Sequence, residues 1–198
     1  AKQQSQQKYF LYGGLALALL FGGFIFNRFR ITSKQKGIIE EQKIKVDEAF
    51  EQLEEKNTEI VDSINYAKRI QSAILPTDKI VNEYLQKSFV LYKPKDIVAG
   101  DFYWLEPMKD GVLFAAADCT GHGVPGAMVS VVCNNGLNRS VREHGLSDPG
   151  QILDKTREIV ISEFEKSEEE VKDGMDIALC ALAGNKLTYA GAHNPLWI

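Results

Sequence analysis

Cysteine and histidine are scarce in this sequence, which limits the metal and covalent chemistry it can support. Only three cysteines and three histidines occur among 198 residues, and they do not form the ligand pattern of a zinc site. The cysteines, Cys119, Cys133 and Cys180, form no close pair, so we expect reduced thiols and no disulfide framework. No histidine precedes His122, which argues against a sensor histidine kinase with its phospho-accepting residue on the N-terminal helix.

Sequence features of nucleotide and nucleic-acid binding are also missing. The G-x-x-x-x-G-K-S/T pattern of a phosphate-binding loop does not occur. The formal net charge is −4 and the second half of the chain carries no basic stripe, so no nucleic-acid partner is expected. Charged residues make up 25% and hydrophobic residues 44% of the chain, a composition typical of a folded protein rather than a disordered one.

Charge is absent over residues 9–27. Nineteen helical residues would reach roughly 28 Å, about the hydrocarbon thickness of a bilayer. Aromatic residues lie at both edges, and more Lys and Arg residues follow the segment than precede it. We therefore predict a polar flank over 1–8 and a single-pass helix over 9–31 in the inner (cytoplasmic) membrane, with its C-terminal side in the cytoplasm. A buried core helix and a signal peptide are the alternatives.

Proline and glycine are absent from residues 38–75, and an apolar residue recurs there at every seventh position. This repeat predicts a left-handed coiled coil, and we assign 32–76 to a signalling helix that forms a parallel homodimer and ends at Pro76. A single amphipathic helix packed on the following domain is the alternative. The d positions are Ile39, Val46, Leu53, Ile60, Ala67 and Ile74, and the a positions are Lys43, Phe50, Asn57, Ile64 and Gln71.

The remaining segment, 77–198, combines patterns typical of strands and of helices. The helices are expected over 125–145 and 147–167, the second with Asp148 as its N-cap and Pro149 at its first position. The order of strand, strand, helix, helix, strand, strand does not alternate, so it predicts an antiparallel α+β fold. The strands are expected in SFVLYKP (88–94), GVLFAAAD (111–118), IALCALAG (177–184), KLTYAG (186–191) and PLWI (195–198).

The stretch ADCTGHGVPGAMVS, residues 117–130, follows an apolar strand and precedes a helix. The strand would deliver Asp118 to the edge of the sheet, and Asp101 in VAGDFYW would be a second carboxylate nearby. Such oxygen ligands suit Mg²⁺ or Mn²⁺, although each aspartate could also be a turn-capping residue. A nucleophilic Cys119 beside His122 is disfavoured, because the neighbouring carboxylate opposes a thiolate.

Four motifs in order carry a resemblance to a known family. AGDFYW, ADCTGHGVPGAMVS, DGMDIALCAL and KLTYAGAHNPLWI resemble the PPM-type metal-dependent serine/threonine protein phosphatases. The sequence is most similar to the branch of sigma-factor regulators of the stage II sporulation protein E (SpoIIE) and RsbU type. The resemblance covers about residues 65–198. It implies an α/β/β/α sandwich, of which 77–198 would form the first part.

The resemblance also implies a site with two Mn²⁺ or Mg²⁺ ions that activate a water against a phosphoserine or phosphothreonine. Asp101, Asp118 and the backbone carbonyl of Cys119 would be metal ligands, and Gly121 and Gly123 would permit the turn around the site. His122 is a candidate catalytic acid. Departures from the motif concern three further residues: Trp104 replaces an acid and is expected to pack in the core, while Asp173 and Asp176 are expected not to be ligands.

The remaining acidic ligands of such a site are expected beyond Ile198. The implied substrate is a phosphorylated protein, such as an anti-sigma-factor antagonist, in a membrane signalling pathway that works by partner switching. A second hypothesis remains open at this point. The chain could belong to a catalytically incomplete module that regulates or binds another protein.

Overall fold

The computed structural model describes residues 2–165 and 172–197, with side chains from residue 11 onward. The chain divides into two units, residues 1–59 and 60–198. One helix, α1 (Lys2–Ile74), begins in the first unit and ends in the second. All other helices and strands of the described residues belong to the second unit.

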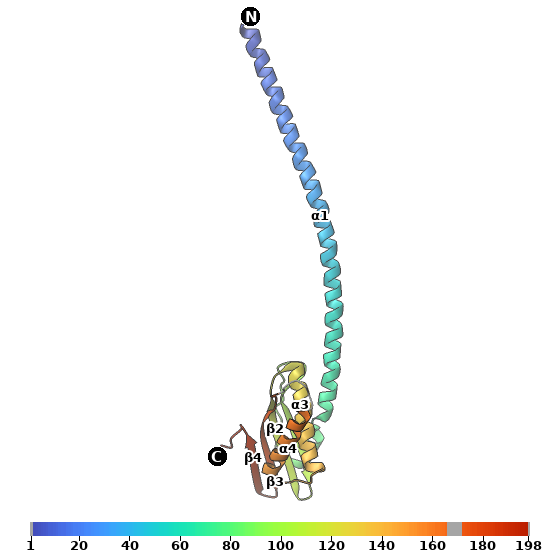
Figure 1. Ribbon diagram of the computed structural model, residues 1–198, viewed down its shortest axis with the longest axis vertical. Helices are drawn as coiled ribbons and strands as arrows, with labels where there is room; N and C mark the ends of the chain where they lie inside the picture. Colours follow the sequence, from blue (N-terminus) through green and yellow to red (C-terminus); the bar gives the residue numbers. More distant parts are fainter. Residues whose placement is uncertain (1, 166–171, 198) are drawn as a thin grey trace. The chain divides into compact units, whose positions relative to one another are not determined.

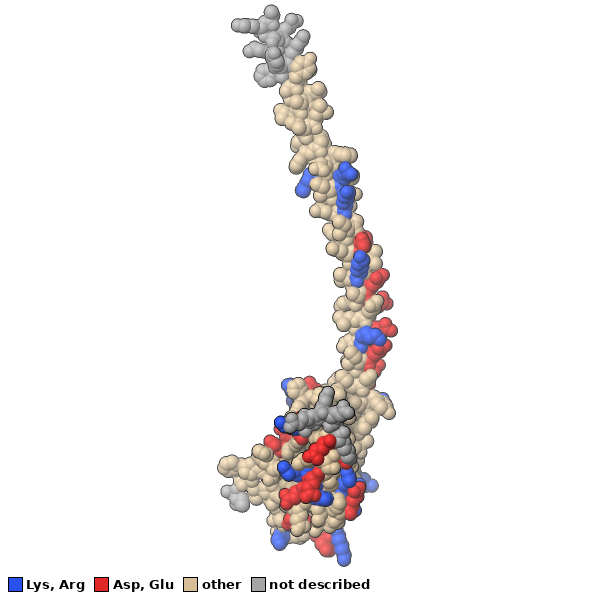
Figure 2. Space-filling model, viewed as in Figure 1, with Lys and Arg blue, Asp and Glu red and all other residues tan. Residues whose placement is uncertain are grey.

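The first unit consists of α1 alone. Every side chain from residue 11 to residue 59 is exposed, and an uncharged stretch of the helix is followed by basic and then by mixed basic and acidic side chains (Figure 2). The helix includes a stretch that could cross a membrane by its length and composition, and none of that stretch is buried. The transmembrane helix over 9–31 stays a prediction.

The second unit is built on a four-stranded antiparallel sheet in the order β1-β2-β3-β4 (Figure 1). The expected α+β class, with a long N-terminal helix and an antiparallel sheet, is confirmed. The strands of this sheet are β1 (Phe102–Met108), β2 (Gly111–Cys119), β3 (Met175–Ala183) and β4 (Lys186–Ala192).

Two of the predicted strands are wrong. Residues 88–94 have no regular structure, and Phe89 and Leu91 within them are 87% and 84% exposed. Residues 195–197 are also irregular, and residue 198 lies outside the described part. Strand-forming side chains stabilise a strand only when a neighbouring strand completes its hydrogen bonds and packing, and the described residues offer no such neighbour to either segment.

Helices α3 (Gly123–Arg142) and α4 (Pro149–Phe164) cover one face of the sheet (Figure 1). The caps are as predicted: the Asp148 side chain accepts a hydrogen bond of 3.1 Å from the Gln151 N–H, and Pro149 opens the helix. The predicted end of the helix at 166–167 falls outside the described residues. Leu113 and Leu179 from the sheet are fully buried in the core beneath these helices.

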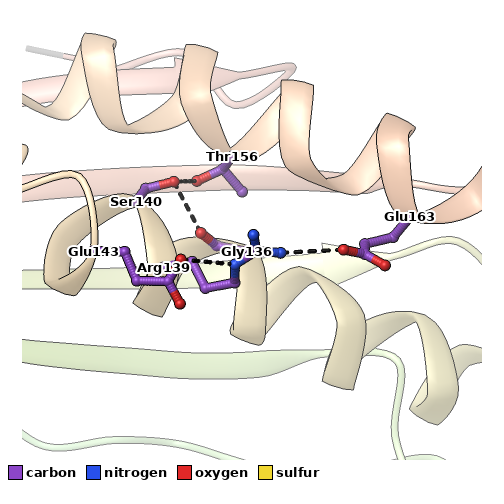
Figure 3. A network of polar contacts seen from close by, with 6 residues as sticks. All are labelled: Gly136, Arg139, Ser140, Glu143, Thr156 and Glu163. Carbon is purple, nitrogen blue, oxygen red and sulfur yellow. Dashed lines mark hydrogen bonds and ion pairs between the residues drawn. The ribbon is translucent and has the colours of Figure 1, made fainter.

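The two helices approach closely at Gly136 of α3. A Cβ atom at this position would lie 3.2 Å from side-chain carbons of Thr156 and Val160 on α4, so the absence of a side chain sets the helix separation. One turn further, the Ser140 and Thr156 hydroxyls lie 2.9 Å apart, and the Ser140 hydroxyl donates to the Gly136 carbonyl at 2.8 Å (Figure 3). The contact between α3 and α4 therefore combines close packing with a buried polar pair.

The last turns of α1 pack within the second unit. Ile64, Ala67 and Ile74, which continue the predicted a and d stripe, are partly buried, and Gln71 is 5% exposed. The stripe therefore changes its environment along one helix. Its earlier members are exposed, and its last four are partly or fully buried within the second unit.

On the other face of the sheet, a short helix begins just after Pro76. This helix, α2 (Asp78–Tyr84), is capped by Thr77, whose hydroxyl accepts from the Ile80 N–H at 3.4 Å. Its Val81 packs with Leu105 and Val112. The sheet thus has an extensive core under α3 and α4 and a smaller apolar cluster on its opposite face.

Candidate functional site

Two aspartates lie opposite each other at one end of the sheet. Phe102 of β1 pairs with Ala117 of β2, so continuing the antiparallel register by one residue places Asp101 opposite Asp118. Directly opposed residues on neighbouring strands project from the same face. The two carboxylates predicted from separate motifs are therefore brought together, as expected from the sequence.

The proximity of these carboxylates changes the acidity of Asp101. Burial raises the pKa of the Asp101 carboxyl, and a hydrogen bond with Asp118 and the negative charge of Asp118 raise this pKa further. Two like charges held at one site favour the protonated form of one of them. A divalent cation bound between the carboxylates would relieve this repulsion.

The backbone turns sharply after β2 and approaches the loop that carries Asp101. Gly121 and Gly123 have φ values of +86° and +62°, a region that glycine adopts without a steric penalty. A Cβ atom at Gly100 would lie 2.6 Å from the Gly121 carbonyl oxygen and 3.1 Å from the Cys119 carbonyl oxygen. This geometry is consistent with the predicted role of Gly121 and Gly123 in the turn. It also places the Cys119 carbonyl beside Gly100, the residue before Asp101.

The side chain of Cys119 points away from this chemistry, into the core under α3. It is 3% exposed and packs in the same cluster as Cys133. A hydrogen bond with the Cys133 thiol, followed by burial and the nearby carboxylates, raises the pKa of the Cys119 thiol. The thiol therefore stays protonated, and a thiolate nucleophile at this position is disfavoured.

His122 is the N-cap residue of α3, but its side chain makes no cap hydrogen bond. Its Nδ1 lies 2.9 Å from an Oδ atom of Asp96, and both side chains are well exposed. The sequence did not predict Asp96 as the partner of His122. The only available signal was its position in KPKDIVAGD, five residues before Asp101.

A third aspartate lies next to Asp118 on the opposite side from Asp101. Asp176 of β3 pairs with Asp118 in the register of β2 and β3. A cavity of about 420 Å³ lies here, and its lining includes Asp118, Asp173, Asp176 and His193. Asp173 and Asp176 were expected not to be ligands, and this stays a prediction, although the register places Asp176 beside Asp118.

The donor set fits a hard divalent cation in part. Asp101 and Asp118 offer carboxylate oxygens and Cys119 offers a carbonyl oxygen, which are ligand types preferred by Mg²⁺ and Mn²⁺. Within the described residues, no group of three or more His, Cys, Asp or Glu side chains is arranged to hold a metal ion. Additional ligands would have to come from water or from further protein residues.

Comparisons with known proteins identify the family of the second unit. Residues 108–198 match the family model described as stage II sporulation protein E (SpoIIE). No curated protein sequence matches the chain.

Among solved structures, the chain is similar to the SiaA-PP2C domain of Pseudomonas aeruginosa, with 35% sequence identity and a TM-score of 0.62. The matched region covers 69% of this chain and 55% of the SiaA structure, so the chain spans little more than half of that structure. With the family match, this similarity shows that the chain carries part of a PPM-type (PP2C-like) phosphatase domain of the SpoIIE branch.

Proposed function

We propose that this chain is part of a metal-dependent phosphatase that hydrolyses phosphoserine or phosphothreonine in a partner protein. The observation that carries the proposal is the juxtaposition of Asp101 and Asp118 at the ends of β1 and β2. Two acids from separate strands raise the free energy of the metal-free site when both are ionised. Such an arrangement is typical of a cation site rather than of independent turn caps.

Each residue of the site has a distinct part in the proposed activity. The carboxylates of Asp101 and Asp118 would hold the cations, and the Cys119 carbonyl would add a neutral oxygen ligand. Bound Mn²⁺ or Mg²⁺ ions would supply a water of lowered pKa and would neutralise charge on the phosphoryl group. Asp96 accepts a hydrogen bond from His122 when its Nδ1 is protonated, which leaves Nε2 of the imidazole to exchange a proton with a bound group.

The first unit supports a membrane signalling role. Its apolar stretch would anchor the protein in the cytoplasmic membrane, and its exposed a and d residues would pair with a second copy in a parallel dimer. Val46, Phe50 and Leu53 are each 65% to 66% exposed, an unfavourable state that pairing would relieve. The phosphatase domain would then lie in the cytoplasm, with a phosphorylated partner-switching protein such as an anti-sigma-factor antagonist as its substrate.

The test is phosphate release from a phosphoserine protein in the presence of Mn²⁺, measured on the protein with its complete phosphatase domain. Asp118→Asn should lower the rate by about 100-fold or more, because metal ions contribute several kcal/mol to transition-state stabilisation. Asp110→Asn is the matched control. Asp110 is an exposed residue of the β1–β2 turn, and the Asn-Gly pair created there also favours a tight turn.

An unchanged rate in Asp118→Asn would contradict the metal-ligand assignment. A wild-type protein that binds a phosphorylated partner but releases no phosphate with Mn²⁺ or Mg²⁺ would instead support the second hypothesis, a regulatory or protein-binding module. Manganese binding, measured by calorimetry, is the second readout. If Asp118 is a ligand, Asp118→Asn should abolish manganese binding as well as turnover.

A further inference from the structure

The contact between Thr120, just after β2, and Gly174, just before β3, combines backbone and side-chain hydrogen bonds. The Thr120 N–H donates to the Gly174 carbonyl at 3.0 Å, as between opposed residues of an antiparallel pair. In return, the Gly174 N–H donates to the Thr120 hydroxyl oxygen at 3.1 Å, and this hydroxyl also lies 3.3 Å from the Gly174 carbonyl as a donor. Both polar groups of the Gly174 backbone are therefore bound by Thr120.

The hydroxyl of Thr120 allows the strand pairing to continue up to the point where the chain turns. Gly121 has a φ of +86°, so the backbone leaves the direction of β2 directly after Thr120. In a regular antiparallel pair the Gly174 N–H would donate to a backbone carbonyl of the opposed residue, and here the Thr120 hydroxyl oxygen takes that place. An aliphatic side chain could not accept this hydrogen bond, whereas threonine or serine can.

The hydrogen bond to Gly174 also sets the direction of the Cys119 carbonyl. The Cys119 C=O and the Thr120 N–H belong to one planar peptide unit, which is trans, so the two groups point in opposite directions. Because the N–H is directed at Gly174 on the β3 side, the C=O is directed toward the β1 side. A Cβ atom at Gly100 would lie only 3.1 Å from the Cys119 oxygen, which agrees with this direction.

We propose that Thr120 is a positioning residue that directs the Cys119 carbonyl toward the metal ligands Asp101 and Asp118. The inference rests on the proposed function, in which this carbonyl is a neutral oxygen ligand. Thr120 acts through the peptide unit that it shares with Cys119 and through its contacts with Gly174. Groups that orient a metal ligand in this way typically contribute about 10-fold to 100-fold to metal affinity.

The first test is calorimetric measurement of Mn²⁺ binding to the protein with its complete phosphatase domain. Thr120→Val keeps the branched shape but removes the hydroxyl, so the dissociation constant for Mn²⁺ should rise about tenfold or more. Thr120→Ser keeps a hydroxyl and should recover most of the lost affinity. Thr188→Val is the matched control, because Thr188 pairs with Ala181 toward the other end of β3, and its affinity should match the wild type.

A second measurement needs no variant and observes the peptide unit itself by NMR. Within this chain, Cys119 is the only cysteine followed by threonine, so ¹³C-carbonyl cysteine combined with ¹⁵N-threonine selects the peptide between Cys119 and Thr120. In the metal-free protein the Thr120 N–H should exchange slowly with solvent, because it is bound to Gly174. Mg²⁺, which is diamagnetic, should then shift the Cys119 carbonyl resonance in a saturable manner, while the Thr120 N–H stays protected.

Several results would overturn the role of Thr120 while leaving the proposed phosphatase intact. These are an unchanged Mn²⁺ affinity in Thr120→Val, an equal loss in Thr188→Val, no recovery in Thr120→Ser, a rapidly exchanging Thr120 N–H, or a Cys119 carbonyl resonance that Mg²⁺ does not shift. A wild-type protein that binds neither Mn²⁺ nor Mg²⁺ would overturn the proposed function as well. If Thr120→Val does not fold, the two NMR results on the wild type decide the question.

Discussion

Gln71 binds the backbone of Ala99 through both ends of its carboxamide. Its Nε2 donates to the Ala99 carbonyl at 2.6 Å, and its Oε1 accepts from the Ala99 N–H at 3.0 Å. The same amide also donates to the Ser130 hydroxyl of α3 at 2.9 Å. Because Ala99 precedes Gly100 and Asp101, one side chain near the end of α1 connects the loop of a metal-ligand candidate to α3.

Gln71→Leu should destabilise the second unit by at least about 2 kcal/mol. The substitution leaves the buried N–H and C=O of Ala99 without their partner, and each unsatisfied group costs about 1–3 kcal/mol. Urea denaturation followed by tryptophan fluorescence measures the loss, since Trp104 is buried in this unit. Gln52→Leu is the control, because Gln52 is an exposed residue of the same helix. Equal stability of the two variants would show that the Gln71 contacts contribute little.

Asp118→Asn should make the metal-free protein more stable at pH 7, although it removes a proposed ligand. The folded-state pKa of Asp101 lies above its ordinary value, through burial and then through Asp118. Between the unfolded and folded pKa values, the folded state holds more protons, so stability falls as the pH rises. Removing the Asp118 charge lowers the folded-state pKa of Asp101 and so reduces the loss of stability at pH 7. Burial still raises the Asp101 pKa in the variant.

The measurement is urea denaturation of both proteins with a chelator at pH 7 and at about pH 4, near the ordinary pKa of an aspartate. The advantage of Asp118→Asn should shrink at the lower pH, where Asp101 is increasingly protonated in both proteins. Adding Mn²⁺ at pH 7 should stabilise only the wild type. An advantage that is the same at both pH values would rule out repulsion between Asp101 and Asp118 as its cause.

Thr156→Val should cost about 1 kcal/mol of stability. The Thr156 hydroxyl is buried beside Ser140 at 2.9 Å, and valine keeps the methyl group that packs near Gly136 while removing the hydrogen bond. A double-mutant cycle with Ser140→Ala isolates the pair. The double variant should lose less stability than the sum of the two single variants, by about 0.5–1.5 kcal/mol. Strict additivity would mean that the two hydroxyls do not stabilise each other.

The sequence predicted the positions of Asp101 and Asp118 better than those of their neighbours. An apolar run that ends in an acid locates Asp118 at a strand end, and this needs only local information. The neighbours of Asp118 depend on strand register, which pairs it with Asp176, 58 residues later in the chain. Register over such a distance is set by packing of the whole sheet, so the position of Asp176 beside Asp118 could not be inferred from DGMDIALC alone.

The apolar repeat of α1 illustrates a second limit. Any partner that buries one face of a helix selects the same spacing of apolar residues. The repeat therefore located the buried stripe but could not tell a second helix from the domain of the same chain. Gln71, a predicted a position, lies where the helix begins to pack on its own domain. Its carboxamide donates hydrogen bonds to the Ala99 carbonyl and the Ser130 hydroxyl.

The a and d residues before Ile60 lead to a direct test of the proposed dimer. Leu53→Cys places a thiol at a d position, and a parallel coiled coil would bring it beside the same thiol of the second copy. Mild oxidation of the full chain in micelles should then give a disulfide-linked dimer. Glu55→Cys is the control, since it lies at position f on the opposite side of the helix.

The native thiols should interfere little with this measurement, since Cys119 and Cys133 are buried and Cys180 is partly buried. Dilution with empty micelles distinguishes a specific dimer from chance encounters, because only a stable dimer keeps its cross-linking yield. Equal yields for Leu53→Cys and Glu55→Cys would contradict the assigned register. No cross-linking of either variant would contradict the parallel dimer itself, and the exposed stripe of α1 would then require a different partner.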